Sequence, residues 1–155
     1  SLPAHAVVIS LEASKNLEGA RPGEGIILRT GDRQTLFDAS VTELMQAAAA
    51  GMAQRGVPHR KRRMDGGTCE GALYLAYGYE TGALAVPLIN YHNHGETAVE
   101  AEAIHADDLA GGVILLEEIA RCLAAESRLP RSLFREQRKA WFYKHSSRFL
   151  AADDQ

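Results

Sequence analysis

Residues 64–73 of this chain read Met64-Asp65-Gly66-Gly67-Thr68-Cys69-Glu70-Gly71-Ala72-Leu73, and residues 90–94 read Asn90-Tyr91-His92-Asn93-His94. The first stretch is predicted to be a glycine-rich loop that enters a helix, and the second to be a loop that follows an apolar strand. Ligands of open α/β sheets bind beyond the carboxyl ends of the strands. Together, the two stretches therefore predict an α/β sheet with a functional site at that edge.

The composition limits the classes of protein that this chain can form. Its 155 residues, 46% of them hydrophobic, are enough for one domain with a buried core. A net charge of −3 argues against a nucleic-acid partner. No apolar run reaches the roughly 18 residues of a membrane span, and the N-terminus lacks the order of a signal peptide. We therefore expect a cytoplasmic protein without membrane contact, in which Cys69 and Cys122 are reduced.

Strand-like and helix-like segments alternate along the chain. Strands are predicted at residues 6–11, 25–29, 57–64, 84–88 and 98–103, and helices at residues 40–54, 69–79 and 107–123. This alternation predicts a three-layer α/β/α fold with a mostly parallel sheet. The apolar run at 6–11 is typical of a strand with neighbours on both sides, so the sheet is expected to be incomplete at its N-terminal side. Residues 1–129 are assigned to this domain and residues 130–155 to a basic, aromatic helix or tail.

The two longer helices are predicted to bury one face each. Ser40 and Glu43 form a capping-box pattern, which predicts that Ser40 is the N-cap of the first helix. Its buried stripe is expected to consist of Leu44, Ala47, Ala48 and Gly51. The buried stripe of the helix at 107–123 is expected to consist of Val113, Leu116, Ile119, Ala120 and Leu123.

The glycine-rich loop supplies candidate substrate-binding residues, which are Gly66, Gly67, Thr68, Cys69 and Glu70. The glycine pair would let backbone N–H groups approach a ligand, or would simply allow a tight turn. Neither the spacing of a phosphate loop nor the dinucleotide glycine triplet is present. Cys69 could form a nucleophile–base pair with His92 or lie in the core. Glu70 could bind an amine or stabilise the start of the helix through the macrodipole.

Glu12 and His92 are candidate metal ligands. Glu12 is predicted to close the first strand and His92 to follow the strand at 84–88, so both are expected at one edge of the sheet. Carboxylates and imidazoles bind metals, but the same residue types are also typical of exposed loops. The basic run at residues 60–63 is interpreted as a solvated strand edge, because strand alternation sends its side chains to two faces.

Four segments occur in the order and spacing of a known family. They are Ile9-Ser10-Leu11-Glu12, Gly23-Glu24-Gly25-Ile26-Ile27, Gly66-Gly67-Thr68-Cys69-Glu70-Gly71-Ala72 and Val86-Pro87-Leu88-Ile89-Asn90-Tyr91-His92-Asn93. From about residue 6 to about residue 124, the chain resembles the C-terminal half of the catalytic domain in the glutamyl-aminopeptidase and tetrahedral-aminopeptidase family, cytosolic hydrolases with two divalent metal ions. The resemblance implies metal-dependent hydrolysis of N-terminal peptide bonds.

The resemblance also implies roles for particular residues. His92 corresponds to a terminal ligand of one metal ion, zinc or cobalt, and Glu12 stands where the family has an aspartate ligand of the other. A glutamate keeps the oxygen donor but reaches one methylene further. Cys69 replaces an acidic residue on the side of the peptide substrate, and Glu70 is expected to supply the displaced carboxylate.

The chain also departs from the family pattern. The family's first metal-binding histidine, its bridging aspartate and the glutamate pair that supplies the general base all precede the matching region, and no segment here replaces them. We therefore expect that this chain contains no catalytic residue and has no activity alone. Its expected partner is the upstream part of a catalytic domain, and a homo-oligomer is a further option. Two alternatives remain: a non-catalytic half-fold or assembly module, and a thiol hydrolase that uses Cys69 and His92.

Overall fold

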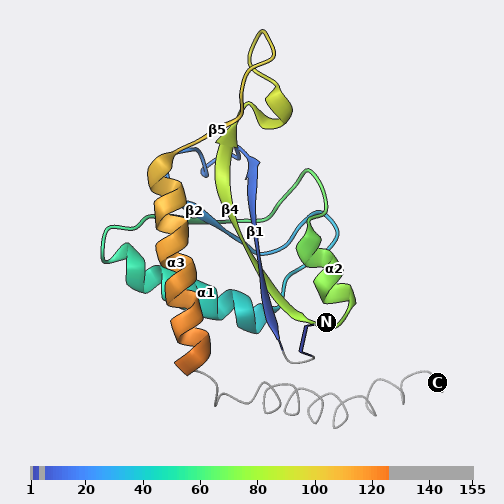
Figure 1. Cartoon of the computed structure of the whole chain (residues 1–155), viewed down its shortest axis with the longest axis vertical. Coiled ribbons are helices and arrows are strands. Elements are labelled where there is room, and N and C mark those ends of the chain that lie inside the picture. Colours follow the sequence, from blue (N-terminus) through green and yellow to red (C-terminus); the bar gives the residue numbers. More distant parts are fainter. Residues whose placement is uncertain (1, 4–5, 126–155) are drawn as a thin grey trace, which may run out of the picture. The chain divides into compact units, whose positions relative to one another are not determined.

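The computed structural model describes residues 2–3 and 6–125 (Figure 1). Residues 1–122 form one unit of the chain and residues 123–155 the other. Of the second unit only residues 123–125 are described, as the end of a helix. The predicted tail at 130–155 and its boundary with the domain lie outside the described residues.

The strands within the described part are β1 Val7–Lys15, β2 Ile26–Arg29, β3 His59–Arg62, β4 Glu80–Ile89 and β5 Ala103–Ile104. The α-helices there are α1 Ala39–Ala53, α2 Glu70–Ala76 and α3 Ala106–Ala125, and a single 3-10 turn, η1, spans Tyr91–Asn93. The strands and helices predicted between residues 6 and 123 are present except the strand predicted at 98–103, of which β5 shares only Ala103. None of the helices described is both long and apolar enough to cross a membrane.

The sheet has the order β1-β4-β2-β3, and β5 pairs with the end of β4. Parallel pairing joins β1 to β4 and β2 to β3, over nine and four residue pairs. Antiparallel pairing joins β4 to β2 and β5, over three and two residue pairs. The prediction of a mostly parallel sheet is therefore confirmed, with an antiparallel pair at its centre. The central β4 is buried on both faces, whereas β1 has one neighbouring strand among the described residues.

Helices cover both faces of the sheet, as the predicted three-layer fold requires. A Cβ added to Gly82 of β4 would overlap Met45 of α1, so the face on which Gly82 lies is covered by α1. On the same face, a Cβ at Gly112 of α3 would lie 2.9 Å from Ile26 Cδ1 of β2. We call this face the apolar face. Ser10 of β1 points to the opposite face and donates a hydrogen bond to Glu70 of α2; we call that face the polar face.

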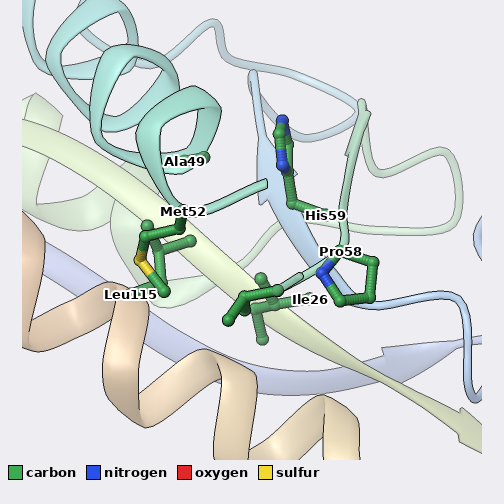
Figure 2. A pocket seen from close by; sticks show the side chains of 7 residues that line it. Ile26, Ala49, Met52, Pro58, His59 and Leu115 are labelled. Carbon is green, nitrogen blue, oxygen red and sulfur yellow. The ribbon is translucent and has the colours of Figure 1, made fainter. Parts of the chain in front are cut away.

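The largest part of the core lies on the apolar face. Figure 2 shows Met52 of α1 and Leu115 of α3 meeting over Ile26 of β2. These three side chains are at most 1% exposed. The small hollow between them is also lined by Ala49, Val57, Pro58 and His59. Because the lining is almost entirely apolar, this hollow is a packing seam and is separate from the residues predicted to carry chemistry.

The predicted N-cap of α1 was wrong, and the predicted buried stripes of α1 and α3 were right only at Ala48 and Ile119. Asp38, and not Ser40, is the N-cap of α1: its carboxylate accepts hydrogen bonds from the backbone N–H groups of Ser40 and Val41. The buried residues of α1 are Val41, Met45, Ala48, Ala49 and Met52, and those of α3 are Asp108, Gly111, Gly112, Leu115 and Ile119. The physical reason is that small residues allow α3 to approach the sheet closely, which turns Val113 outward to 62% exposure.

Candidate functional site

The candidate site lies on the polar face of the sheet. Strand register places Ser10, Ala83 and Arg29 in one row across β1, β4 and β2, because directly paired residues share a face. Glu12 lies in the next row, opposite Ala85. The alanines of β4 leave room above the sheet for the longer side chains beside them. Glu12 is therefore an interior residue of β1 and does not close the strand, because the pairing with β4 continues to Lys15.

Asp32 fixes the entry into α2. The residue is fully buried, and its carboxylate accepts hydrogen bonds from the Thr35 hydroxyl at 2.7 Å and from the backbone N–H groups of Gln34, Thr35 and Cys69 at 2.9, 2.7 and 3.1 Å. Burial raises the pKa of Asp32, but these hydrogen bonds outweigh burial and hold the pKa below its usual value. Asp32 is therefore an ionised structural anchor that the sequence reasoning did not identify.

The glycine-rich loop is attached to the end of β1 and to the turn after β2. The backbone N–H of Met64 donates to the Gly31 carbonyl and that of Arg33 donates to the Gly67 carbonyl, both at 3.0 Å. Lys15, the last residue of β1, forms an ion pair of 3.0 Å with Asp65. These contacts hold the loop beside the carboxyl end of β1.

The predicted substrate-binding segment thereby meets the strand that carries Glu12. The Ser10 hydroxyl donates to Glu70 Oε1 at 3.1 Å, across sixty residues of sequence. Thr68 and Glu70 are exposed, and Gly67 is half-buried. The structure thus brings Glu70 to the polar face of β1 and Gly66 beside Lys15 at the end of this strand.

Cys69 precedes α2 and is half-buried. Burial raises the pKa of its thiol, the neighbouring carboxylates of Glu12 and Asp32 raise it further, and hydrogen bonding to Gly71 and Ala72 opposes the shift. A raised pKa keeps sulfur as the thiol, whereas nucleophilic cysteines require the thiolate. This environment argues against the thiol-hydrolase alternative.

Glu12 is the predicted ligand whose surroundings suit a cation. Its Oε1 is buried and has no hydrogen-bond partner among the residues described. Burial raises the pKa of Glu12; the charge of Arg29 lowers it, and those of Glu70 and Asp32 raise it again. An unpaired carboxylate oxygen in such a place lacks compensation for its lost hydration, which a bound cation would provide.

His92 lies apart from this group. It is exposed and belongs to η1, where its backbone φ is 59°. This turn is part of the segment between β4 and β5, residues 90–102, which projects beyond β5 in Figure 1 and is called the arm here. Its ring stacks on Tyr91 with centroids 4.0 Å apart, and its backbone N–H donates to Glu102 Oε1 at 2.7 Å.

The carboxyl ends of β1 and β4 do lie at the same edge, because these strands are parallel. Glu12, however, faces Ala85, four residues before the end of β4 at Ile89 and so about 13 Å back along the strand. No hydrogen bond or ion pair joins Glu12 to His92, and the described residues contain no group of three or more His, Cys, Asp or Glu side chains that could hold a metal ion.

Arg29 is the second residue that sequence reasoning missed. It is 1% exposed, and its three guanidinium nitrogens have no hydrogen-bond partner in the described part of the chain. Burial lowers the pKa of Arg29, and the negative charge of Glu12 opposes this shift. A sequence signal existed: an arginine that ends a strand of otherwise apolar residues, Ile26–Arg29, is unusual where both faces of the sheet are covered.

The fold of this chain is similar to the folds of several solved aminopeptidase structures. An aminopeptidase from the archaeon Desulfurococcus kamchatkensis is 18% identical with a TM-score of 0.55, covering 75% of this chain and 33% of its own length. The TET1 peptidase of Pyrococcus horikoshii, which can assemble into a tetrahedron or an octahedral shell, is 19% identical with a TM-score of 0.53, covering 73% and 33%. An aminopeptidase of the M18 family from Thermotoga maritima is 16% identical with a TM-score of 0.53, covering 73% and 28%.

The chain therefore has the fold of part of the TET-type and M18-type aminopeptidases, which confirms the predicted resemblance at the level of the fold. It spans about a third of the length of these proteins. No protein-family model and no curated protein sequence matches it.

Proposed function

We propose that this chain is part of a metal-dependent aminopeptidase-like hydrolase. The observation that supports the proposal is the buried carboxylate oxygen of Glu12, which has no hydrogen-bond partner among residues 2–3 and 6–125 and lies on the strand that meets the glycine-rich loop. The fold around it is shared with aminopeptidases. The proposed reaction is the hydrolysis of an N-terminal peptide bond in a peptide substrate.

Each group of the chain has a proposed role in this reaction. Glu12 would be a terminal ligand of one divalent ion and His92 of the other, which requires the segment that carries His92 to lie closer to Glu12 than it does in this structure. When bound, two such ions, zinc or cobalt, supply an activated water molecule and a Lewis acid. The backbone of Gly66 and Gly67 would contact the substrate, and Glu70, oriented by Ser10, would attract its ammonium group.

The chain by itself would be an incomplete site. Catalytic zinc sites use about three protein ligands, and one ligand per ion gives weak binding. The remaining ligands and the general base would come from the upstream part of a catalytic domain. Assembly into a homo-oligomer is part of the proposal, by analogy with the TET1 peptidase, and so is a cytoplasmic location.

Calorimetric titration of the whole chain with zinc or cobalt tests the proposal. We expect weak binding, above the micromolar range, that Glu12→Gln reduces at least about tenfold by removing the charged donor. Glu43→Gln, on the exposed surface of α1, is the matched control and should bind as the unaltered chain does. Equal binding by the Glu12 variant would contradict the assignment of Glu12.

The same preparation tests activity on a panel of chromogenic aminoacyl substrates. We expect no turnover by the chain alone, with or without metal. Metal-independent turnover that alkylation abolishes would instead favour the alternative that uses Cys69 and His92. Sub-micromolar binding of two ions would mean that the chain holds ligands beyond those named here.

A further inference from the structure

Arg29 is a buried cation that forms no ion pair with any residue that the structure describes. Guanidinium groups stay protonated in proteins and present five donors. Here the three nitrogens that carry those donors are buried and unpartnered within the described residues. Burying a charge without hydrogen bonds costs several kcal/mol, so such groups occur where something compensates them.

The carboxylates around Arg29 do not provide that compensation. Glu12 is within electrostatic range, yet no ion pair of 4.0 Å or less joins the two residues. Asp65 is paired with Lys15, and Asp32 is saturated by hydrogen bonds from Thr35 and its neighbours. The guanidinium therefore keeps its full donor capacity on the side of the polar face.

Two residues of the glycine-rich loop, Asp65 and Cys69, lie within electrostatic range of Arg29. A Cβ added to Gly67 would meet no atom within 4 Å, and one added to Gly66 would meet only the end of the Lys15 side chain. The ion pair of Lys15 and Asp65 is itself exposed, at 42% and 63%, and exposed pairs of this kind contribute little to stability. A small molecule would reach Arg29 if Gly66 and Gly67 moved, which breaks this exposed pair and the hydrogen bond from Arg33 to the Gly67 carbonyl.

We propose that Arg29 binds the carboxylate of a small organic acid on the polar face, beneath the glycine-rich loop. A carboxylate matches the planar guanidinium with two parallel hydrogen bonds, and a charge-assisted pair of this kind is among the strongest in proteins. The site requires no metal ion and no residue outside this chain. It is therefore independent of the proposed hydrolase activity, and either proposal can fail while the other stands.

Thermal unfolding of the metal-free chain in sodium acetate, against sodium chloride of the same ionic strength, tests this site. We expect a saturable increase of about 3–6 °C in the unfolding temperature with acetate, because a ligand that binds only the folded state stabilises it. Arg29→Met should abolish the increase, and Arg29→Lys should weaken it because an ammonium lacks the planar fork. Arg33→Met removes the same charge from an exposed position on the neighbouring turn and should leave the increase unchanged.

Three outcomes would overturn the assignment: no increase beyond that in chloride, an equal increase in the Arg29→Met variant, or a larger increase with inorganic phosphate than with acetate. Removing an unpaired buried charge is not expected to prevent folding. If the variant nevertheless fails to fold, the Nε–H resonance of Arg29 in the unaltered chain decides the matter by NMR. A shift of that resonance on addition of acetate supports the site, and an unchanged resonance rejects it.

Discussion

The two faces of the sheet use the same strands for different purposes. On the apolar face, Ile26 and Leu28 of β2 pack against helices with almost no exposure. On the polar face, Arg29 of the same strand is equally buried, but its guanidinium has no hydrogen-bond partner in the described part of the chain, and the same holds for Oε1 of Glu12 in β1. Alternation along a strand makes this division possible, because neighbouring residues point to opposite faces. The apolar face supplies stability, and the polar face holds charged groups at the expense of stability.

Truncation in the apolar face should have the largest effect. Leu115→Ala is expected to lower the free energy of unfolding by about 2–5 kcal/mol, because it removes a side chain that is 1% exposed and leaves a cavity between α1, α3 and β2. Urea denaturation monitored by circular dichroism measures the loss.

Val113→Ala, on the same helix, is the control for this prediction. Val113 is 62% exposed, so its truncation should change the free energy of unfolding by less than about 0.5 kcal/mol. A larger loss in the Val113 variant than in the Leu115 variant would mean that α3 packs through the stripe predicted from the sequence, and the description of the apolar face would be wrong.

A smaller effect is expected for the anchor of the polar face. Asp32→Asn keeps the shape of the side chain but replaces the carboxylate with an amide, whose NH2 group would face the hydrogen-bond donors of Thr35 or Cys69. The free energy of unfolding should therefore fall by about 1–3 kcal/mol. Asp107→Asn, whose side chain is 92% exposed, should have almost no effect.

The pH dependence of the Asp32 variant gives a second measurement. The folded-state pKa of Asp32 lies below its unfolded value of about 3.9, so the folded state binds fewer protons. The stabilisation is therefore complete above about pH 4 and is lost as the pH falls through the folded-state pKa. The difference between the unaltered chain and the variant should shrink over this range; a constant difference would contradict the role of the charge.

The smallest effect concerns the one titratable side chain in the seam of Figure 2, His59. Burial lowers its pKa, the charge of Arg60 lowers it further, and Nδ1 is buried without a partner among the described residues. The unfolded chain therefore binds more protons at mildly acid pH, and stability should decline as the pH falls below about 6.5.

His59→Gln should remove this part of the decline, as measured by urea denaturation between about pH 7 and about pH 5. His94→Gln, an exposed residue on the arm, should retain it. A decline of the same slope in both variants would show that His59 is protonated equally well in the folded and unfolded states.

The candidate site could be predicted only in part. The glycine-rich loop and Glu12 were identified because glycines before a helix and a carboxylate in an apolar strand are local features of the sequence. Arg29 was missed because it stands on β2, two strands from β1, and only the antiparallel register of β2 and β4 places it one row from Glu12. Glu12 and His92 were expected to lie close together because both were placed at the ends of parallel strands. Glu12 instead lies in the interior of β1, so this expectation lost its basis.

The sequence by itself determined the kinds of elements, their order and the class of fold, because hydrophobic periodicity and turn-forming residues act within a few positions of the chain. Tertiary structure alone decided which face of each helix is buried, which strands pair in which direction, and which charged side chains share a surface. Those outcomes depend on contacts between segments that are far apart in sequence, as in the hydrogen bond from Ser10 to Glu70. Local propensity carries no information about such contacts, because side-chain packing and strand register select them only when the whole sheet forms.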